Sequence, residues 1–155
     1  MQASSIPPSS SPEALVLERI PHRTPFLFID RVLSEGDDKL TAEWSVPKDL
    51  FCFEGHYPGN PILPGVLIQE HTFQASALLI YGTEASSDAP GTPVLTKVES
   101  ARFKNLVRPG DTITTEVELI ERVANARVCK AVVRSDKGVV ARLQFVLALV
   151  SEAKA

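Results

Sequence analysis

Residues 53–67 read FEGHYPGNPILPGVL, a stretch with three prolines and three glycines. Neither a helix nor a strand can persist through so many prolines, so the stretch is predicted to be a loop. Proline lowers the entropy lost when a loop is ordered, which indicates that the path of this loop matters. Pro64 suits the first position of a helix, where no N–H group is needed. A long central helix is therefore predicted over residues 64–79.

The sequence on both sides of this segment predicts a sheet. A short helix over residues 12–18 comes first, a loop over 82–93 follows the central helix, and the rest of the chain is predicted to be β-structure. Five strands have predicted limits, at residues 26–33, 40–46, 112–123, 127–134 and 139–150. Residues 112–123 show the alternation of a strand with one solvated face. The expected fold is α+β, with five or six mostly antiparallel strands around one long helix on the concave face.

Composition limits the number of domains and the class of partner. With 155 residues, of which 44% are hydrophobic and 23% charged, the chain has the size of one globular domain. We expect a flexible Ser- and Pro-rich tail over 1–12 and a single domain over 13–151. The net charge of −3 and the lack of a basic run argue against nucleic acid. The longest apolar run, 145–150, is far below the roughly 20 residues of a membrane span.

Two cysteines, Cys52 and Cys129, are far apart and show no metal-ligand spacing. A disulfide framework or a metal site therefore has little support, and two reduced thiols are expected. This use of cysteine favours a cytoplasmic protein.

His56 and Glu70 are the candidate pair for proton transfer. A single histidine in a loop is most often a structural or surface residue, so a functional role for His56 is supported only if its neighbours fit one. Glu70 falls on a mostly apolar helix face, which comprises Val66, Leu67, Phe73, Gln74, Ala77 and Leu78. Desolvation there disfavours a charged carboxylate and suits a proton donor. The alternative is a glutamate at the edge of this face that reaches water.

The predicted helix start adds hydrogen-bond donors to this pair. The N–H groups of Gly65 and Val66 have no acceptor within the helix, and they point out of its positive end. Such donors suit a thioester oxygen that gains negative charge. Gln74, one turn after Glu70, could hold the carboxyl group in place. A base, an acid and oxyanion donors thus occur between His56 and Glu70.

The chain resembles the 3-hydroxyacyl-[acyl carrier protein] dehydratases of fatty-acid synthesis, of the FabZ type. The matching parts are residues 20–27, 30–32, 55–67, Glu70, Gln74, 101–104 and 109–111. The resemblance implies a hot-dog fold and a homodimer with two active sites at the subunit interface. It implies that His56 is the base, that Glu70 of the other subunit is the acid, and that the Gly65 N–H polarises the thioester. Neither a metal nor a cofactor is expected, and a trimer of dimers is left open.

The resemblance also implies substrate and partner contacts. Residues expected to bind the acyl chain are Val66, Gln74, Phe53, Ile62, Leu63 and Phe103, although core packing explains any of the last four equally well. The partner is an acyl carrier protein, which is acidic. Basic residues near the tunnel mouth are therefore candidates for docking it, namely Arg102, Lys104 and Arg108. The solvated face of a strand is the alternative for these three.

Several residues depart from the family pattern or have a second interpretation. Tyr57 stands where Phe is common, and the polar, bulky residues 71–73 leave the preferred chain length open. His71 points about 100° away from Glu70, so it is predicted to lie at an interface or on the surface. His22 is predicted to be structural, and Asn60 is expected to hold the loop through local hydrogen bonds.

Two other functions are compatible with the sequence. One is another hot-dog enzyme, either an acyl thioesterase or a hydratase acting on coenzyme A esters. The other is a non-catalytic subunit that binds an acyl carrier protein. The presence of both His56 and Glu70 argues against the second, because a binding module needs neither.

Overall fold

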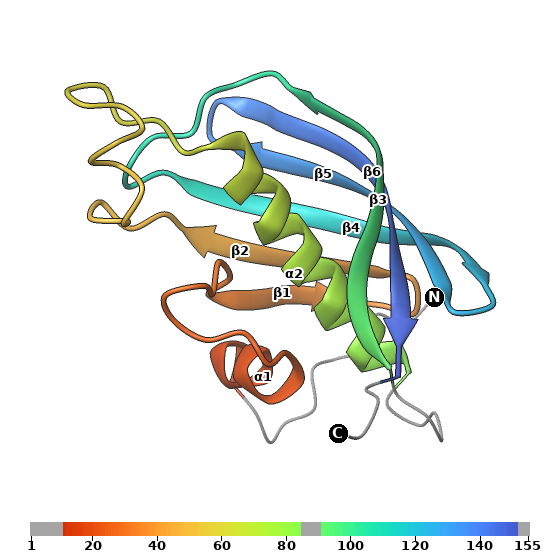
Figure 1. The fold of residues 1–155 in the computed structure, drawn as a ribbon. Helices are drawn as coiled ribbons and strands as arrows, with labels where there is room; N and C mark the ends of the chain where they lie inside the picture. Colours follow the sequence, from red (N-terminus) through yellow and green to blue (C-terminus); the bar gives the residue numbers. More distant parts are fainter. Residues whose placement is uncertain (1–10, 85–90, 152–155) are drawn as a thin grey trace.

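The computed structural model describes residues 11–84 and 91–151 (Figure 1). This part of the chain forms α1 (Pro12–Arg19), β1 (Arg31–Glu35), β2 (Lys39–Ser45), α2 (Gly65–Thr83), β3 (Thr92–Phe103), β4 (Thr112–Val123), β5 (Ala126–Ser135) and β6 (Gly138–Val150). All neighbouring strands are antiparallel, in the order β1-β2-β4-β5-β6-β3. Figure 1 shows the sheet curving around α2, which crosses its concave face. The predicted α+β hot-dog fold is confirmed.

Helix α2 is the centre of the molecule because it is apolar on nearly every side. A helix of this kind is stable only when protein surrounds it. Its buried side chains are Leu67, Ile68, His71, Thr72, Gln74, Ala75, Ser76, Ala77, Leu78, Leu79 and Ile80. The N–H groups of Leu67 and Ile68 both donate to the carbonyl oxygen of Pro64, at 2.9 and 3.3 Å. Pro64 is therefore the residue just before the helix rather than its predicted first residue, and the helix extends past residue 79 to Thr83.

The sheet supplies the other wall of the core through alternating residues. Along β4, Ile113, Thr115, Val117 and Leu119 are buried, and the residues between them are more exposed. The same period continues along β5 and β6. Because the side-chain period of a strand is two, one face of β4, β5 and β6 is buried in the core and the other meets water.

The first strand begins later than predicted. The sequence predicts a strand over 26–33, whereas β1 begins at Arg31. Backbone groups of Phe26 and Phe28 bond to the side chains of Gln74 and His71 on α2 instead of to a neighbouring strand. The first backbone bond of this segment to β2 is made by the N–H of Asp30. Side chains of the central helix thus replace the strand ladder here.

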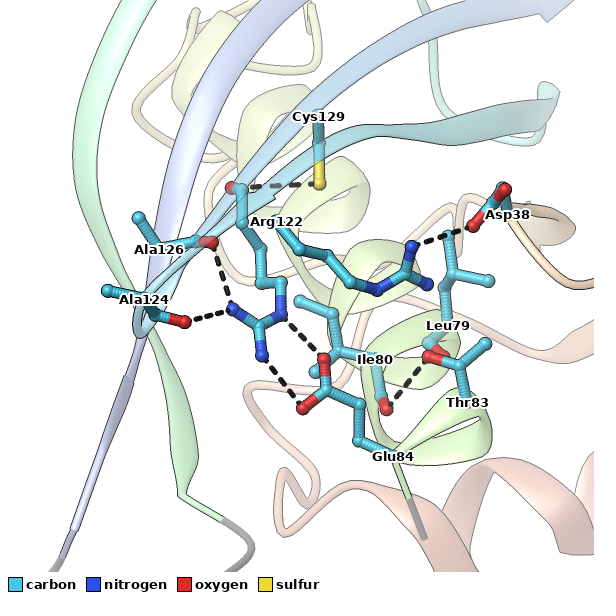
Figure 2. Close-up of polar contacts among 10 residues, drawn as sticks. Asp38, Leu79, Ile80, Thr83, Glu84, Arg122, Ala124, Ala126 and Cys129 are labelled. Carbon is cyan, nitrogen blue, oxygen red and sulfur yellow. Dashed lines mark hydrogen bonds and ion pairs between the residues drawn. The ribbon is translucent and has the colours of Figure 1, made fainter. Parts of the chain in front are cut away.

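An ion pair ties the C-terminal end of α2 to the sheet (Figure 2). Arg127 donates from Nε and Nη2 to the two carboxylate oxygens of Glu84, at 2.5 and 3.0 Å. Its Nη1 donates to the carbonyl oxygens of Ala124 and Ala126, both at 2.9 Å. Figure 2 shows these carbonyl groups and the Glu84 carboxylate converging on one guanidinium group. Such bidentate geometry fixes the helix end with a defined orientation.

Two predicted segments fall partly outside the described residues. Residues 1–10 of the expected tail and 85–90 of the expected loop are not described, while α1 begins at Pro12 and β3 begins at Thr92. Within the described ranges, no helix has the length and apolar character needed to cross a membrane. No cluster of three or more potential metal-binding His, Cys, Asp or Glu side chains occurs in the same ranges.

Candidate active site

His56 lies in the loop between β2 and α2, and its backbone is held on both sides. Its N–H donates to the carbonyl oxygen of Cys52 at 2.9 Å, and its carbonyl oxygen accepts from the N–H of Ile62 at 2.9 Å. The imidazole ring stacks on the ring of Tyr57, with centroids 4.0 Å apart. His56 is therefore part of an ordered loop, although its side chain is only partly buried.

The hydrogen bond of the His56 ring determines which nitrogen can act as a base. Nδ1 lies 2.7 Å from the carbonyl oxygen of Ile62. A carbonyl oxygen can only accept, so in the neutral ring Nδ1 carries the proton and Nε2 keeps its lone pair. No hydrogen-bond partner of Nε2 occurs in the part of the chain that the structure describes. This nitrogen is free to take a proton from a substrate.

Arg108, in the segment before β4, forms hydrogen bonds that hold the same loop. Tyr57 and Asn60 exchange two backbone hydrogen bonds, at 3.1 and 2.9 Å, around Gly59, whose φ is +71°. Arg108 donates from Nη1 to Oδ1 of Asn60 at 2.9 Å and to the carbonyl oxygen of Pro61 at 3.2 Å. Asn60 thus makes local hydrogen bonds through its backbone, whereas its side chain accepts from Arg108 of a distant segment rather than from a local donor.

Asp111 stabilises the segment that carries Arg108. Its carboxylate accepts from the Arg108 N–H at 2.9 Å and from Nζ of Lys137 at 2.8 Å. Burial by itself would raise the pKa of Asp111, but these hydrogen bonds and the two positive charges outweigh it and lower the pKa. A charged Asp111 therefore holds this turn at neutral pH.

Gly65 begins α2 directly against an aromatic ring. A Cβ atom at this position would lie 3.2 Å from Cζ of Phe103. The close approach explains why the smallest residue stands at the helix start. The N–H groups of Gly65 and Val66 have no acceptor among the described residues. They remain available for a negatively charged oxygen at the positive end of the helix.

Glu70 lies one turn further along α2, with its side chain 24% exposed. Its Oε1 accepts from Nε2 of Gln74 at 3.1 Å. The Gln74 amide is itself held, since Nε2 donates to the Phe26 carbonyl at 3.2 Å and Oε1 accepts from the Phe28 N–H at 2.9 Å. Nε2 of His22 lies 3.7 Å from Oε1 of Glu70. The carboxyl group therefore has a defined orientation, as the sequence predicts for a Gln74 contact.

The two candidate groups for proton transfer are not joined within one chain. In the described residues, no hydrogen bond or ion pair connects His56 with Glu70: His56 bonds to Ile62, whereas Glu70 bonds to Gln74 and faces His22. Gly65 lies between them in sequence and contacts Phe103. One chain thus presents the parts of a site on the loop and on the helix without connecting them.

The residues expected to line an acyl tunnel differ in exposure. Phe53 and Leu63 belong to the hydrophobic core of the chain, and Gln74 is buried. Ile62 is half-buried. Val66 and Phe103 are exposed to 68% and 45%. Val66 and Phe103 can therefore meet a substrate directly in the single chain.

The predicted docking residues Arg102, Lys104 and Arg108 are all exposed. Arg102 on β3 lies directly opposite Arg142 on β6, so two positive charges share one face of the sheet. Neither Arg102 nor Lys104 forms an ion pair with an acidic residue of the described chain. Arg108 differs from them because its guanidinium group already bonds Asn60 and Pro61.

The prediction for His71 is wrong. His71 is completely buried, with Nδ1 2.6 Å from the Phe28 carbonyl and Nε2 2.6 Å from the Thr115 hydroxyl. Desolvation lowers its pKa to about 4, so the ring is neutral at pH 7. The helix is enclosed on this side too, by β4 and by the segment around Phe28. A rotation of 100° from Glu70 therefore leads into the protein rather than to the surface.

Sequence reasoning also missed the contact between His22 and Glu70. Nδ1 of His22 is buried without a hydrogen-bond partner in the described chain, and its Nε2 faces the carboxylate. No local pattern links these two positions, because they are brought together only by the packing of residues 20–30 on α2.

The thiol groups of Cys52 and Cys129 are both free. Burial raises the pKa of Cys52, and it raises the pKa of Cys129 to about 12.

Comparison with protein families and curated relatives gives a consistent result. The model of the FabA-like domain matches residues 20–144. The 3-hydroxyacyl-[acyl-carrier-protein] dehydratase FabZ of Petrotoga mobilis is 34% identical over 134 residues, which cover 86% of this chain and 94% of the relative. The protein of that name from Myxococcus xanthus is 36% identical over 138 residues, which cover 88% of this chain and 90% of that protein. That from Symbiobacterium thermophilum is 44% identical over 105 residues, covering 67% and 72%.

Solved structures share the fold at low sequence identity. The dehydratase heterocomplex ApeI:P from Xenorhabdus doucetiae matches with a TM-score of 0.75 at 14% identity, covering 88% of this chain and 91% of the other. A hypothetical thioesterase with coenzyme A from Streptococcus pneumoniae matches with a TM-score of 0.61 at 12% identity, covering 80% and 88%. At these identities the likeness concerns the fold alone.

Proposed function

Because the chain belongs to the FabA-like family, we infer that it is a 3-hydroxyacyl-[acyl-carrier-protein] dehydratase of fatty-acid biosynthesis, with His56 as base and Glu70 as acid. The enzyme removes water from the 3-hydroxyacyl thioester and leaves a trans-2-enoyl thioester. The observation that supports His56 most directly is the bond from its Nδ1 to Ile62, which leaves the Nε2 lone pair free.

Each proton has a defined donor and acceptor in this reaction. Nε2 of His56 takes the proton from C2, and the electron pair of that C–H bond forms the C2–C3 double bond. The C3–O bond breaks, and Glu70 gives its proton to the departing hydroxyl, which leaves as water. The N–H of Gly65 donates to the thioester oxygen and stabilises the negative charge that grows on it. Afterwards the proton on His56 returns to Glu70, through solvent or the water formed.

A homodimer completes the site in this proposal. Strand β3 lies at the edge of the sheet and carries exposed apolar side chains, namely Val94, Leu95, Val98 and Phe103. A long apolar edge strand is suited to pairing with another chain. Phe103, at the end of β3, contacts Gly65, so a second copy bound along this edge approaches the helix start. We propose that His56 of one subunit acts with Glu70 of its partner.

The partner that brings the substrate is proposed to be an acyl carrier protein. Arg102 and Arg142 lie side by side without acidic partners in the described chain, at the end of β3 where Arg102 immediately precedes Phe103. Two adjacent positive charges repel one another and are relieved by an acidic surface. Arg108 contributes by holding the loop of His56 rather than by contact alone. A cytoplasmic location, where thiols stay reduced, fits the free Cys52 and Cys129.

The proposal is tested with the purified protein and 3-hydroxyacyl thioesters of several chain lengths, on acyl carrier protein and on coenzyme A. Formation of the enoyl product is followed by absorbance, and a thiol reagent detects any thioester hydrolysis. His56→Ala and Glu70→Gln are expected to lower kcat at least about 100-fold while remaining folded. Glu54→Gln, an exposed glutamate of the same loop, serves as the control. Release of free thiol without enoyl product would instead establish a thioesterase.

A further inference from the structure

His71 is a fully buried polar residue that the proposed reaction does not use. It stacks on Trp44 with ring centroids 5.9 Å apart, and both ring nitrogens have partners at 2.6 Å. The Phe28 carbonyl can only accept, so Nδ1 of the neutral ring donates to it. Nε2 then accepts from the hydroxyl of Thr115, which is also fully buried. A buried network is stable only if each polar group is satisfied, and this one is.

Two side chains of α2 hold the backbone of Phe28 from both sides. His71 donates to its carbonyl oxygen, while Oε1 of Gln74 accepts from its N–H at 2.9 Å. Residues 24–30 have no neighbouring strand along most of their length, so these contacts take the place of a sheet ladder. The position of Phe28 therefore depends on His71 and, through it, on Thr115 in β4.

The same backbone determines which end of the Gln74 amide faces Glu70. Because Oε1 is occupied by the Phe28 N–H, the NH₂ group must point toward Phe26 and Glu70, where it donates at 3.2 and 3.1 Å. A reversed amide would place its oxygen against a carboxyl oxygen. With Oε1 of Glu70 occupied by Gln74, the transferable proton belongs on Oε2.

We propose that His71 is a positioning residue for Glu70. Thr115 holds the ring of His71, His71 holds the backbone of Phe28, and Phe28 orients the Gln74 amide that bonds Glu70. This inference rests on the proposed role of Glu70 as the acid. His71 itself touches neither substrate nor reacting atoms. It keeps the Gln74 N–H directed at one carboxyl oxygen and leaves the other free for the substrate hydroxyl.

The variants separate this role from simple packing. His71→Leu removes both hydrogen bonds and fills much of the space, whereas His71→Asn keeps an N–H donor near the position of Nδ1. Thr115→Val removes only the hydroxyl behind the ring. Thr72→Val is the control, because the Thr72 hydroxyl is equally buried but bonds only within its own helix, to the Ile68 carbonyl. Urea unfolding of each variant establishes that it is folded under the conditions of the assay.

The expected kinetic result is a loss in kcat rather than in substrate binding. His71→Leu lowers kcat about tenfold with KM within about twofold, His71→Asn restores most of the loss, and Thr72→Val matches the wild type. If His71 acts through Gln74, the double variant His71→Leu/Gln74→Ala loses no more than Gln74→Ala alone. The proposal would be overturned if the kcat losses of His71→Leu and Gln74→Ala multiplied in the double variant, or if His71→Asn and His71→Leu lost kcat equally.

A spectroscopic measurement distinguishes this inference from the proposed function. The side-chain amide resonances of Gln74, assigned by their disappearance in Gln74→Ala, are expected to shift in His71→Leu and Thr115→Val but not in Thr72→Val. Unchanged resonances in His71→Leu overturn the positioning role whatever the activity. Shifted resonances together with full activity of Glu70→Gln would instead remove Glu70 as the acid and leave the structural link intact.

Discussion

The ring of Phe103, at the end of β3, lies against Gly65, so that a Cβ atom on Gly65 would come within 3.2 Å of Cζ of that ring. The contact joins the edge strand to the helix start that carries the proposed oxyanion donors. A neighbour at this distance must move by a few tenths of an ångström to admit a methyl group.

Gly65→Ala is therefore expected to disturb the helix start rather than the fold. We expect kcat/KM to fall about tenfold because the N–H donor shifts, while the free energy of unfolding stays the same or rises slightly, since Ala favours a helix over Gly. Phe103→Leu in the same protein gives the methyl group room and is expected to restore part of the activity. Equal activity of Gly65→Ala and the wild type would contradict the assignment of Gly65.

A site shared between subunits predicts that two inactive variants complement each other. In a mixed dimer of His56→Ala and Glu70→Gln chains, one site has both changes and the other has neither. After random exchange half of the dimers are mixed, so activity per site recovers to about a quarter of the wild type. Activity is measured before and after the two proteins are unfolded and refolded together. No recovery, with mixed dimers detected by mass spectrometry, would place both groups in one chain.

Carrier-protein docking predicts an effect that depends on the carrier. Arg102→Glu is expected to raise KM about tenfold for substrate on acyl carrier protein, and the effect should shrink at high salt. KM for the same acyl group on coenzyme A changes much less, because the protein surface of the carrier is missing. Arg134→Glu, an exposed charge reversal on β5, is the matched control. Equal losses on both carriers would mean that Arg102 acts on the acyl group or on folding.

The lowered pKa of the buried His71 ring makes the free energy of unfolding depend on pH. Its pKa falls to about 4 in the folded chain because burial disfavours the charged ring, whereas in the unfolded chain the pKa has its ordinary value of 6.5. The unfolded state therefore binds more protons between these values, and the free energy of unfolding decreases as the pH falls from 6.5 to 4. Above pH 6.5 the ring is neutral in both states, so its titration costs no stability there, and the loss reaches about 3 kcal/mol once the pH is below 4.

Urea unfolding between pH 7 and pH 4 checks this dependence. His71→Leu is expected to be less stable at pH 7 but to lose less stability on acidification. The contacts of His71 are the carbonyl of Phe28, the hydroxyl of Thr115 and the ring of Trp44, none of which is charged. Parallel pH profiles for the variant and the wild type would show that His71 titrates alike in both states.

Features that depend on neighbouring residues could be predicted from the sequence alone. The alternation in β4, the apolar character of α2 and the proline before Gly65 each report a local preference, so the elements and the α+β class could be predicted. The contact of Gln74 with Glu70 follows from the same rule, because residues four apart lie on one helix face.

Which surfaces of these elements are covered depends on contacts between distant segments and is visible only in the folded chain. The periodicity gives the direction of His71 relative to Glu70, but not that β4 and Phe28 lie there. It cannot place His22 beside Glu70, nor show that side chains of α2 replace the ladder of the predicted strand at 26–33. The physical reason is that such contacts join segments far apart in the sequence. Their hydrogen bonds form only once the core has brought the backbones together.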